Sequence, residues 1–246
     1  MTNFIIDIIS DPVCPWCYIG KKRLDRAITL YQKVYPSGRH DTFTLNWKAY
    51  YLDPSAPVKG ISFFERQMQK LLLSSSSSSS SSSPQLQPRS TKEEERLGEL
   101  AKKQQDRLLE IGRREGIEFS FRGKIGNTKS AHRAILFSKT NGNGNDDAQD
   151  GFVNALFAAY FEGEADITSH EDLVNIGASV GLDRAAMLAW LDDGEGGHVV
   201  DGEDRAAREM RVRGVPSFTV QGQTLDGAQD VQTFLDLFVR IKEEQR

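Results

Sequence analysis

Two hydrophobic periodicities near the start of the chain predict a strand, a helix and a second strand. Residues 4–9 form a short, β-branched apolar run of the kind found in buried strands. Apolar residues then recur at helical spacing, which predicts a helix from Pro15 to about Val34. Residues 43–49 alternate between apolar and polar, which predicts another strand. A β-α-β unit of this kind indicates parallel strands joined by a right-handed crossover.

The end of the chain predicts a hairpin followed by a helix. Residues 214–220 indicate a turn that runs into a strand, and a tight turn at 221–223 leads into a partner strand. Apolar residues at helical spacing follow from Val231 to Val239. The segment between, residues 53–213, is mainly helical in pattern. The sequence therefore predicts an α/β fold of order β-α-β … β-β-α. Residues 1–52 and 214–246 would form one domain and residues 53–213 a helical insertion domain.

A run of serines interrupts the helical pattern. Residues 74–83 are all serine, and Pro84 and Pro88 follow. Serine side chains bury little apolar surface, so such a segment cannot offset the entropy lost on ordering. Residues of about 74–91 are therefore predicted to form a disordered insert with no role in catalysis.

The composition fits a soluble globular protein and argues against two kinds of partner. Of the 246 residues, 38% are hydrophobic and 27% are charged. A net charge of −4 and a pI near 5.7 favour neither nucleic acid nor an anionic membrane surface. No apolar run reaches membrane-spanning length, and the N-terminus lacks the basic region of a signal peptide. With only two cysteines, the expected location is the cytoplasm.

Those two cysteines, Cys14 and Cys17, lie where the first strand gives way to the helix. Pro15 suits the first helical turn, whose N–H groups have no partner within the helix. A thiolate at Cys14 would face those N–H groups and the positive end of the helix dipole, so Cys14 is expected to react at neutral pH. Cys17 lies one turn further along and is expected to be more buried. The pattern predicts a nucleophile, Cys14, and a resolving thiol, Cys17.

Two other roles for the cysteine pair are less favoured. The pair could be half of a metal site, but the histidines are scattered and none shows the close spacing of a second ligand pair, so no metal is predicted. The four histidines are His40, His132, His170 and His198. A purely structural disulfide would close a very short loop and would gain little stability.

A basic run, Lys21-Lys22-Arg23, follows the cysteines. A solvated helix face is the expected role. The alternative is that these side chains hold a thiolate or attract an acidic thiol such as glutathione.

Four motifs in this order resemble the thioredoxin superfamily, and within it the DsbA-like group and its FrnE-like branch of cytoplasmic disulfide oxidoreductases. They are residues 11–21 (Asp-Pro-Val-Cys-Pro-Trp-Cys-Tyr-Ile-Gly-Lys), Asn127-Thr128 with Ala131-His132-Arg133, residues 214–218 (Gly-Val-Pro-Ser-Phe), and Gly227-Ala228-Gln229. The resemblance covers nearly the whole chain except the serine run, and it implies a thioredoxin fold with a helical insertion.

The resemblance also implies roles for residues outside the cysteine pair. It implies a cis peptide between Val215 and Pro216 that faces the cysteines. Since proline has no N–H, the preceding backbone is left free to pair with a substrate strand. Residues that would bind substrate are Pro15, Trp16, Val215, Pro216, Asn127 and His132. For His132, a structural role is the preferred interpretation.

Two departures from the family pattern accompany the match. Ser217 stands where relatives often carry a bulky aromatic residue, which would alter the cleft wall. The serine run also lengthens a helical segment that is compact in relatives. In addition, the second cysteine pair described for some FrnE-like proteins is missing. A sister group, the kappa-class glutathione transferases and chromene carboxylate isomerases, has serine in place of the nucleophilic cysteine. The presence of both Cys14 and Cys17 therefore favours a redox function over an isomerase or transferase function.

Three functions are carried forward. The leading one is a thiol-disulfide oxidoreductase that acts on protein or small-thiol substrates, with no bound cofactor and with glutathione or another thiol as co-substrate. The second is a glutathione-dependent isomerase or transferase that acts on a small aromatic or electrophilic substrate. The third is a non-enzymatic binding or chaperone module. No oligomeric state is predicted.

Overall fold

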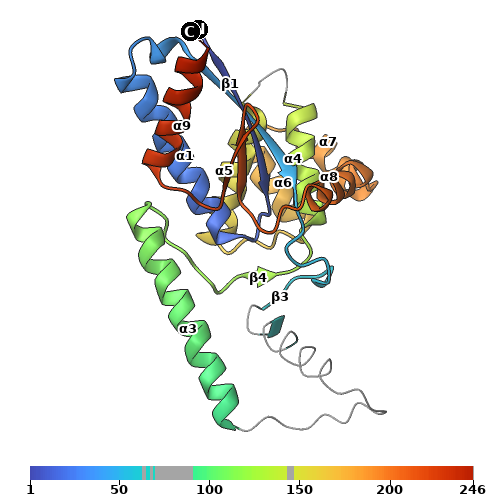
Figure 1. The fold of residues 1–246 in the computed structure, drawn as a ribbon. Helices are drawn as coiled ribbons and strands as arrows, with labels where there is room; N and C mark the ends of the chain where they lie inside the picture. Colours follow the sequence, from blue (N-terminus) through green and yellow to red (C-terminus); the bar gives the residue numbers. More distant parts are fainter. Residues whose placement is uncertain (63–64, 67–68, 70–90, 143–146, 246) are drawn as a thin grey trace.

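A four-stranded sheet in the order β2-β1-β5-β6 forms the centre of the computed structural model, which describes residues 1–62, 65–66, 69, 91–142 and 147–245 (Figure 1). The strands of this sheet are β1 (Asn3–Ser10), β2 (Thr42–Ala49), β5 (Ser217–Val220) and β6 (Gln223–Asp226). A separate antiparallel pair is formed by β3 (Ile61–Ser62) and β4 (Lys124–Ile125).

Helices make up most of the chain between β2 and β5. The helices are α1 (Pro15–Val34), α3 (Thr91–Arg114), α4 (Lys129–Thr140), α5 (Ala148–Phe161), α6 (His170–Ser179), α7 (Arg184–Asp192), α8 (Gly197–Glu209) and α9 (Val231–Glu244), with a short 3₁₀ turn η1 (Gly38–His40). The β-α-β start and the β-β-α end are both as predicted. In the part of the chain that is described, no helix is both long enough and apolar enough to cross a membrane.

The register of the sheet brings the two ends of the chain together. β1 runs parallel to β2 and antiparallel to β5, and Ile8 is paired with Trp47 on one side and with Phe218 on the other. Ser217, the first residue of β5, pairs with Ile9 near the end of β1. The segment just before β5 therefore lies beside the loop that leaves β1, although some 200 residues separate them in sequence.

One face of the sheet is buried and the other is largely open. The Phe4 ring contacts Tyr31 of α1 and Phe238 of α9, each with 5.4 Å between ring centroids. Successive side chains of a strand point to opposite faces, so Ile5 points away and is 47% exposed. The run at 4–9, predicted to be a buried strand, is thus buried on one side along most of its length. Near its end Ile9, on the same side as Ile5, is buried as well, beside Tyr50 and Ala207.

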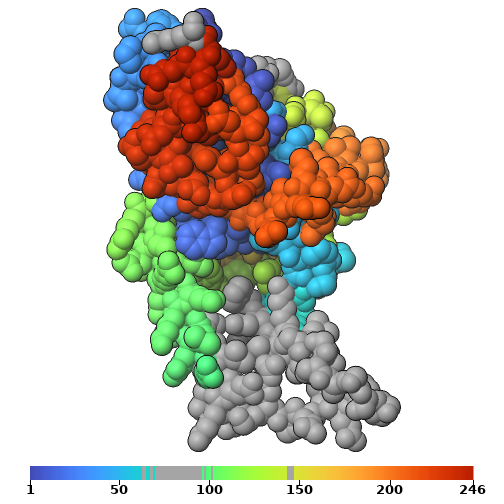
Figure 2. Space-filling view, in the orientation of Figure 1, coloured from blue at the N-terminus to red at the C-terminus, as the bar shows by residue number. Residues whose placement is uncertain are grey.

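The intervening helices pack against edge strand β2 and against α1. α5 and α8 both contact β2, and the Tyr18 ring of α1 stacks on Phe157 of α5 with 5.2 Å between centroids. One hydrophobic core takes side chains from the sheet, α1, α9 and the intervening helices. α3 extends away from this core, as Figures 1 and 2 show, and only its C-terminal part packs against it, through residues such as Leu108 and Ile111. The proposed boundary between a domain of residues 1–52 and 214–246 and one of residues 53–213 remains a prediction.

Part of the inserted segment lies outside the described residues. The predicted disordered insert, about 74–91, is in that part except for Thr91, where α3 begins.

Candidate active site

The loop that leaves β1 places Cys14 at the N-cap of α1. Cys14 has extended backbone angles, φ −89° and ψ 110°, and Pro15 follows in the first turn. The Cys14 N–H donates to the Asp11 carbonyl at 2.9 Å, and the Cys17 N–H donates to the Cys14 carbonyl at 3.0 Å. This confirms the predicted start of the helix, with Cys14 beside the unpaired N–H groups of its first turn.

Both thiols are buried, and Cys14 contacts the segment before β5. Cys14 is 4% exposed and Cys17 is 1% exposed, and the two are free thiols in this structure. The Cys14 Sγ lies 3.4 Å from the carbonyl oxygen of Val215. The Val215–Pro216 peptide bond is cis, as the resemblance implies. The structure thus brings together Cys14, Cys17, Val215 and Pro216, which the sequence separates widely.

Gly20 allows α1 to approach this segment closely. A Cβ at position 20 would lie 3.0 Å from Phe218 Cζ and 3.1 Å from Pro216 Cγ, which is tighter than ordinary van der Waals contact. A larger residue would therefore push α1 away from Pro216, and with it the cysteine pair.

The Cys17 thiol is held mainly in its protonated form. Burial raises its pKa well above the usual value, and the neighbouring Cys14 sulfur adds to this. The Ser10 hydroxyl and the Asp11 N–H hydrogen-bond to the Cys17 sulfur and oppose the rise. These two donors favour the Cys17 thiolate when it forms.

Asp11 supplies a buried carboxyl beside the cysteine loop. Its side chain is 1% exposed, and it accepts hydrogen bonds from the N–H groups of Leu52 at 2.8 Å and Val13 at 3.4 Å. Burial outweighs these bonds and raises the pKa of Asp11 to about 7. The sequence analysis assigned no role to Asp11. The available signal was an acid placed between an apolar strand and the first cysteine.

His132 and Asn127, two of the predicted substrate-binding residues, have partners within the protein. The His132 Nε2 lies 3.3 Å from the Tyr50 carbonyl oxygen and 3.8 Å from Asp11 Oδ1, and the residue is 4% exposed. Burial lowers the pKa of His132 to about 4. The Asn127 side chain accepts from the Lys129 N–H at 2.9 Å, at the start of α4. Contact of either residue with a substrate remains a prediction.

The surface around the cysteines is apolar. Trp16 is 37% exposed, and Pro15 and Val13 border a hollow of about 140 Å³. Its other walls include Leu108, Phe121, Ile125, Tyr160 and Phe161. Within the described residues, no cluster of three or more His, Cys, Asp or Glu side chains forms a metal site.

The basic run after the cysteines is not a solvated face, which corrects the expectation for Lys21. Its ammonium is buried, at 2.5 Å from Asp25 and 3.0 Å from Asp150. The Arg23 guanidinium pairs with Glu115 at 2.7 Å. Lys21 is buried because α5 packs across α1 and brings Asp150 to it. These two cations hold α1 to the inserted segment rather than a thiolate.

Comparison with known proteins gives one family and several similar structures. A profile of the DSBA-like thioredoxin domain matches residues 5–239. A probable DsbA oxidoreductase from Streptomyces coelicolor is similar with a TM-score of 0.73 and 22% identity, over 98% of this chain and 91% of that one. A search of the curated proteins found no match.

Two further structures are similar at lower identity. A 2-hydroxychromene-2-carboxylate isomerase has a TM-score of 0.64 at 17% identity, over 98% of this chain and 97% of that one. The cytosolic disulfide reductase DsbM from Pseudomonas aeruginosa, solved with GSH, has a TM-score of 0.55 at 14% identity, over 98% of each chain. At these identities the likeness concerns the fold.

Proposed function

Because the chain belongs to the family of DSBA-like thioredoxin domains, we propose that it is a thiol-disulfide oxidoreductase whose reactive pair is Cys14 and Cys17. One observation carries the proposal. Cys14 caps α1 with its Sγ 3.4 Å from the Val215 carbonyl oxygen, and Cys17 lies one turn further along the helix. A sulfur in this position lies at the positive end of the α1 dipole and has a second thiol one turn away.

The exchange proceeds in two steps. The Cys14 thiolate attacks one sulfur of a substrate disulfide, so a bond between Cys14 and the substrate forms, the substrate S–S bond breaks, and the leaving thiolate takes up a proton. Cys17 then loses its proton and attacks the Cys14 sulfur. This forms the Cys14–Cys17 disulfide and releases the second substrate thiol. Two electrons pass from the pair to the substrate, and the reverse sequence oxidises a dithiol.

The second step depends on making a buried thiolate. Burial disfavours the Cys17 thiolate, whereas the Ser10 hydroxyl and the Asp11 N–H stabilise it by hydrogen bonds. Since the uncharged thiol is preferred at rest, Cys17 is set to act after Cys14. Ser10 and Asp11 are positioning residues for this step.

The exposed Trp16 and the Val215 backbone would border the bound substrate, and Pro15 would lie against its apolar part. The chain is proposed to act in the cytoplasm and to exchange with a protein thiol or with glutathione, which would also recycle the pair. Neither a bound cofactor nor a metal is needed for the exchange.

The test is a trapping experiment with insulin as the disulfide substrate. We expect Cys17→Ser to accumulate a mixed disulfide at Cys14, detected by mass spectrometry, and Cys14→Ser to show no reduction of insulin and no adduct. Serine is the closest match to cysteine in size, so both variants should fold. Undiminished insulin reduction by Cys14→Ser would overturn the proposal.

A second candidate is a glutathione-dependent isomerase or transferase. The apolar hollow of about 140 Å³ beside Val13 and Pro15 favours it, because a void of that size accepts a single aromatic ring. In that case Cys14 would only bind or activate glutathione. Cys17→Ala would then remain fully active on a small electrophile in the presence of glutathione, whereas an oxidoreductase would lose turnover.

A further inference from the structure

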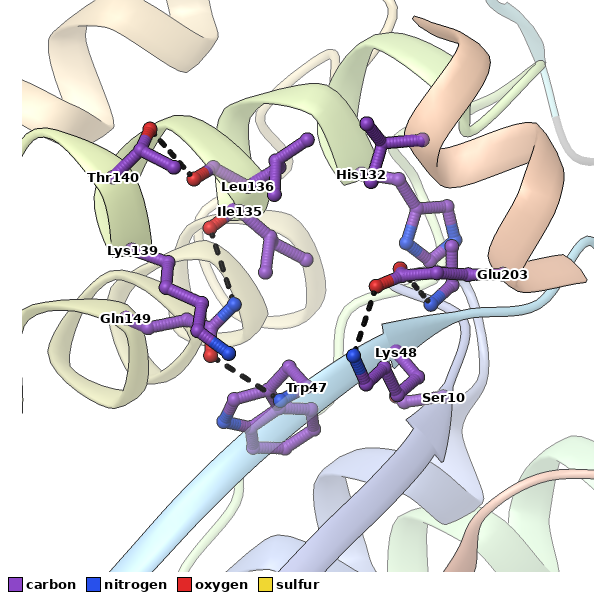
Figure 3. Close-up of a pocket in the computed structure, with 12 residues that line it drawn as sticks. Ser10, Trp47, Lys48, His132, Ile135, Leu136, Lys139, Thr140, Gln149 and Glu203 are labelled. Atoms are coloured by element: carbon purple, nitrogen blue, oxygen red, sulfur yellow. Dashed lines mark hydrogen bonds and ion pairs between the residues drawn. The ribbon is translucent and has the colours of Figure 1, made fainter. Parts of the chain in front are cut away.

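A cavity of about 420 Å³ lies beyond the end of β1, and neither Cys14 nor Cys17 is among the residues that line it (Figure 3). It is enclosed by the ends of β1 and β2, by α4, by the start of α5 and by α8, and we call it the α4–α8 cavity. Ser10 lies at one end of it and Lys139 of α4 at another part of its wall. The volume falls within the range of small-molecule sites, which is roughly 300–1,000 Å³.

The walls of the α4–α8 cavity are largely apolar. Trp47 of β2, Ile135 and Leu136 of α4, and Val199 of α8 all line it. The side-chain amide of Gln149, which also lines the cavity, is already hydrogen-bonded within the protein. It accepts from the Trp47 N–H at 3.2 Å and donates to the Ile135 carbonyl at 3.4 Å. Because both ends of the Gln149 amide are bonded within the protein, the side chains that remain for contact with a ligand in this part of the cavity are mainly apolar.

The charged groups of the cavity leave one cation without an acidic partner. Lys48 pairs with Glu203 at 3.3 Å, and the other Glu203 oxygen accepts from the Ala49 N–H at 3.0 Å. Lys139 is an exposed residue at the rim of the cavity, and its ammonium donates to the neutral side chain of Asn46 at 3.2 Å. Among the described residues it has no carboxylate within ion-pair distance. Figure 3 shows Lys139 reaching from α4 toward β2.

His132 gives the cavity a second unused polar group. The residue is 4% exposed and lines the cavity, and its Nε2 is directed to the Tyr50 carbonyl. With the proton on Nε2, the other ring nitrogen is an acceptor, and it has no hydrogen-bond partner among the residues that the structure describes. A carboxylate has no proton to donate to this nitrogen, so His132 does not select between carboxylate ligands, and the charge of Lys139 remains the selecting feature.

We propose that the α4–α8 cavity binds a small monocarboxylate with an apolar body. The carboxylate lies against Lys139, and the apolar part lies against Trp47 and Leu136. A carboxylate suits the site because Lys139 at its rim has no carboxylate partner among the described residues, and an apolar body suits the side chains of Trp47 and Leu136. The inference goes beyond the proposed exchange at Cys14 and does not depend on it.

The test measures binding of 3-phenylpropionate by isothermal titration calorimetry, with 3-phenylpropionamide as the uncharged control of the same shape. We expect the carboxylate to bind at least about tenfold more tightly than the amide, the difference expected of a charge-assisted hydrogen bond. Lys139→Gln should remove that difference. Lys33→Gln, an exposed lysine of α1 remote from the cavity, should leave it unchanged.

Two more variants separate this site from the cysteine pair. Leu136→Trp should abolish binding by filling the cavity, and circular dichroism would establish that the variant is folded. The Cys14→Ser/Cys17→Ser double variant should bind the carboxylate as tightly as the parent does.

The proposal would be overturned by equal affinity for acid and amide, by full affinity in Lys139→Gln, or by no saturable binding at millimolar concentration. Binding that is lost in the double variant would also overturn it, because the ligand would then belong to the thiol site. Failure of the insulin test leaves these outcomes unaffected.

Discussion

The Asp11 carboxyl and the His132 imidazole lie 3.8 Å apart, yet each is buried in surroundings that favour its uncharged form. Burial raises the pKa of Asp11 to about 7 and lowers the pKa of His132 to about 4. His132 Nε2 is closer to the Tyr50 carbonyl, at 3.3 Å, than to Asp11. The two groups therefore meet as neutral acid and neutral base over the range between these values, and not as an ion pair.

Asp11 should make the protein less stable as pH rises. Between its ordinary pKa of 3.8 and about 7, the folded state holds a proton on Asp11 that the unfolded state has lost. The free energy of unfolding therefore falls with rising pH across this range, by on the order of 1 kcal/mol per pH unit from this group. Asp11→Asn should remove this contribution, so its free energy of unfolding, measured by urea unfolding across this range, should rise with pH relative to that of the parent by the same amount. An unchanged pH dependence in Asp11→Asn would contradict the account.

His132 should act in the opposite direction. Between about pH 4 and its ordinary pKa of 6.5, the unfolded state binds a proton that the folded state does not. The free energy of unfolding then rises with pH, so the two groups offset each other in the parent. His132→Asn should leave the fall due to Asp11 uncompensated, by on the order of 1 kcal/mol per pH unit. The same urea series tests this, and a free energy of unfolding that does not fall with rising pH in His132→Asn would contradict it.

Ser10 should control the resolving step. Its hydroxyl stabilises the Cys17 thiolate, so Ser10→Ala should raise the pKa of Cys17 further. Loss of a hydrogen bond to a charged group should slow release of a mixed disulfide from Cys14 about tenfold near neutral pH. The readout is the pH profile of that rate, whose midpoint should move to higher pH. Ser55→Ala, on the exposed surface, is the matched control. A lower rate with an unmoved midpoint would indicate a purely structural role.

Lys21 should contribute more to stability than its neighbour Lys22. Lys21→Met leaves the carboxylates of Asp25 and Asp150 without their shared cation. Because these are 41% and 23% exposed and can be hydrated, we expect a loss of about 1–3 kcal/mol, less than for a fully buried pair. Lys22 lies over the Tyr18 ring, at 5.2 Å, and has only a small electrostatic effect on Asp25, so Lys22→Met should cost less than about 1 kcal/mol. Equal losses in denaturant unfolding would refute this assignment.

The elements set by local sequence were predictable. Pro15 at the start of α1, the alternation along β2 and the turn between β5 and β6 depend on neighbouring residues, and all three are where the sequence indicates. The family match confirms the thioredoxin fold implied by the motifs. The cysteine pair was found for the same reason, since its spacing and its position before a helix are visible in one short stretch.

The features that could not be predicted from the sequence depend on contacts between distant segments of the chain. Lys21 is buried only because α5 brings Asp150 against α1, and the pattern of residues around Lys21 resembles a solvated face. Ile5 belongs to an apolar run but points to the open face of the sheet. The sequence pattern does not show which face of the sheet the helices leave uncovered. The approach of His132 to Asp11 likewise requires the packing of α4 against the end of β1.

The central claim is that Cys14 and Cys17 form a working redox couple, and the redox midpoint of the pair tests it most directly. The protein would be equilibrated in graded glutathione buffers, and free thiols would be counted by alkylation and mass spectrometry. We predict a single two-electron transition between about −270 mV, typical of a reductant, and about −120 mV, typical of an oxidant. If no Cys14–Cys17 disulfide forms, or if one glutathione remains attached to Cys14, the account is contradicted and the glutathione-dependent isomerase becomes the better description.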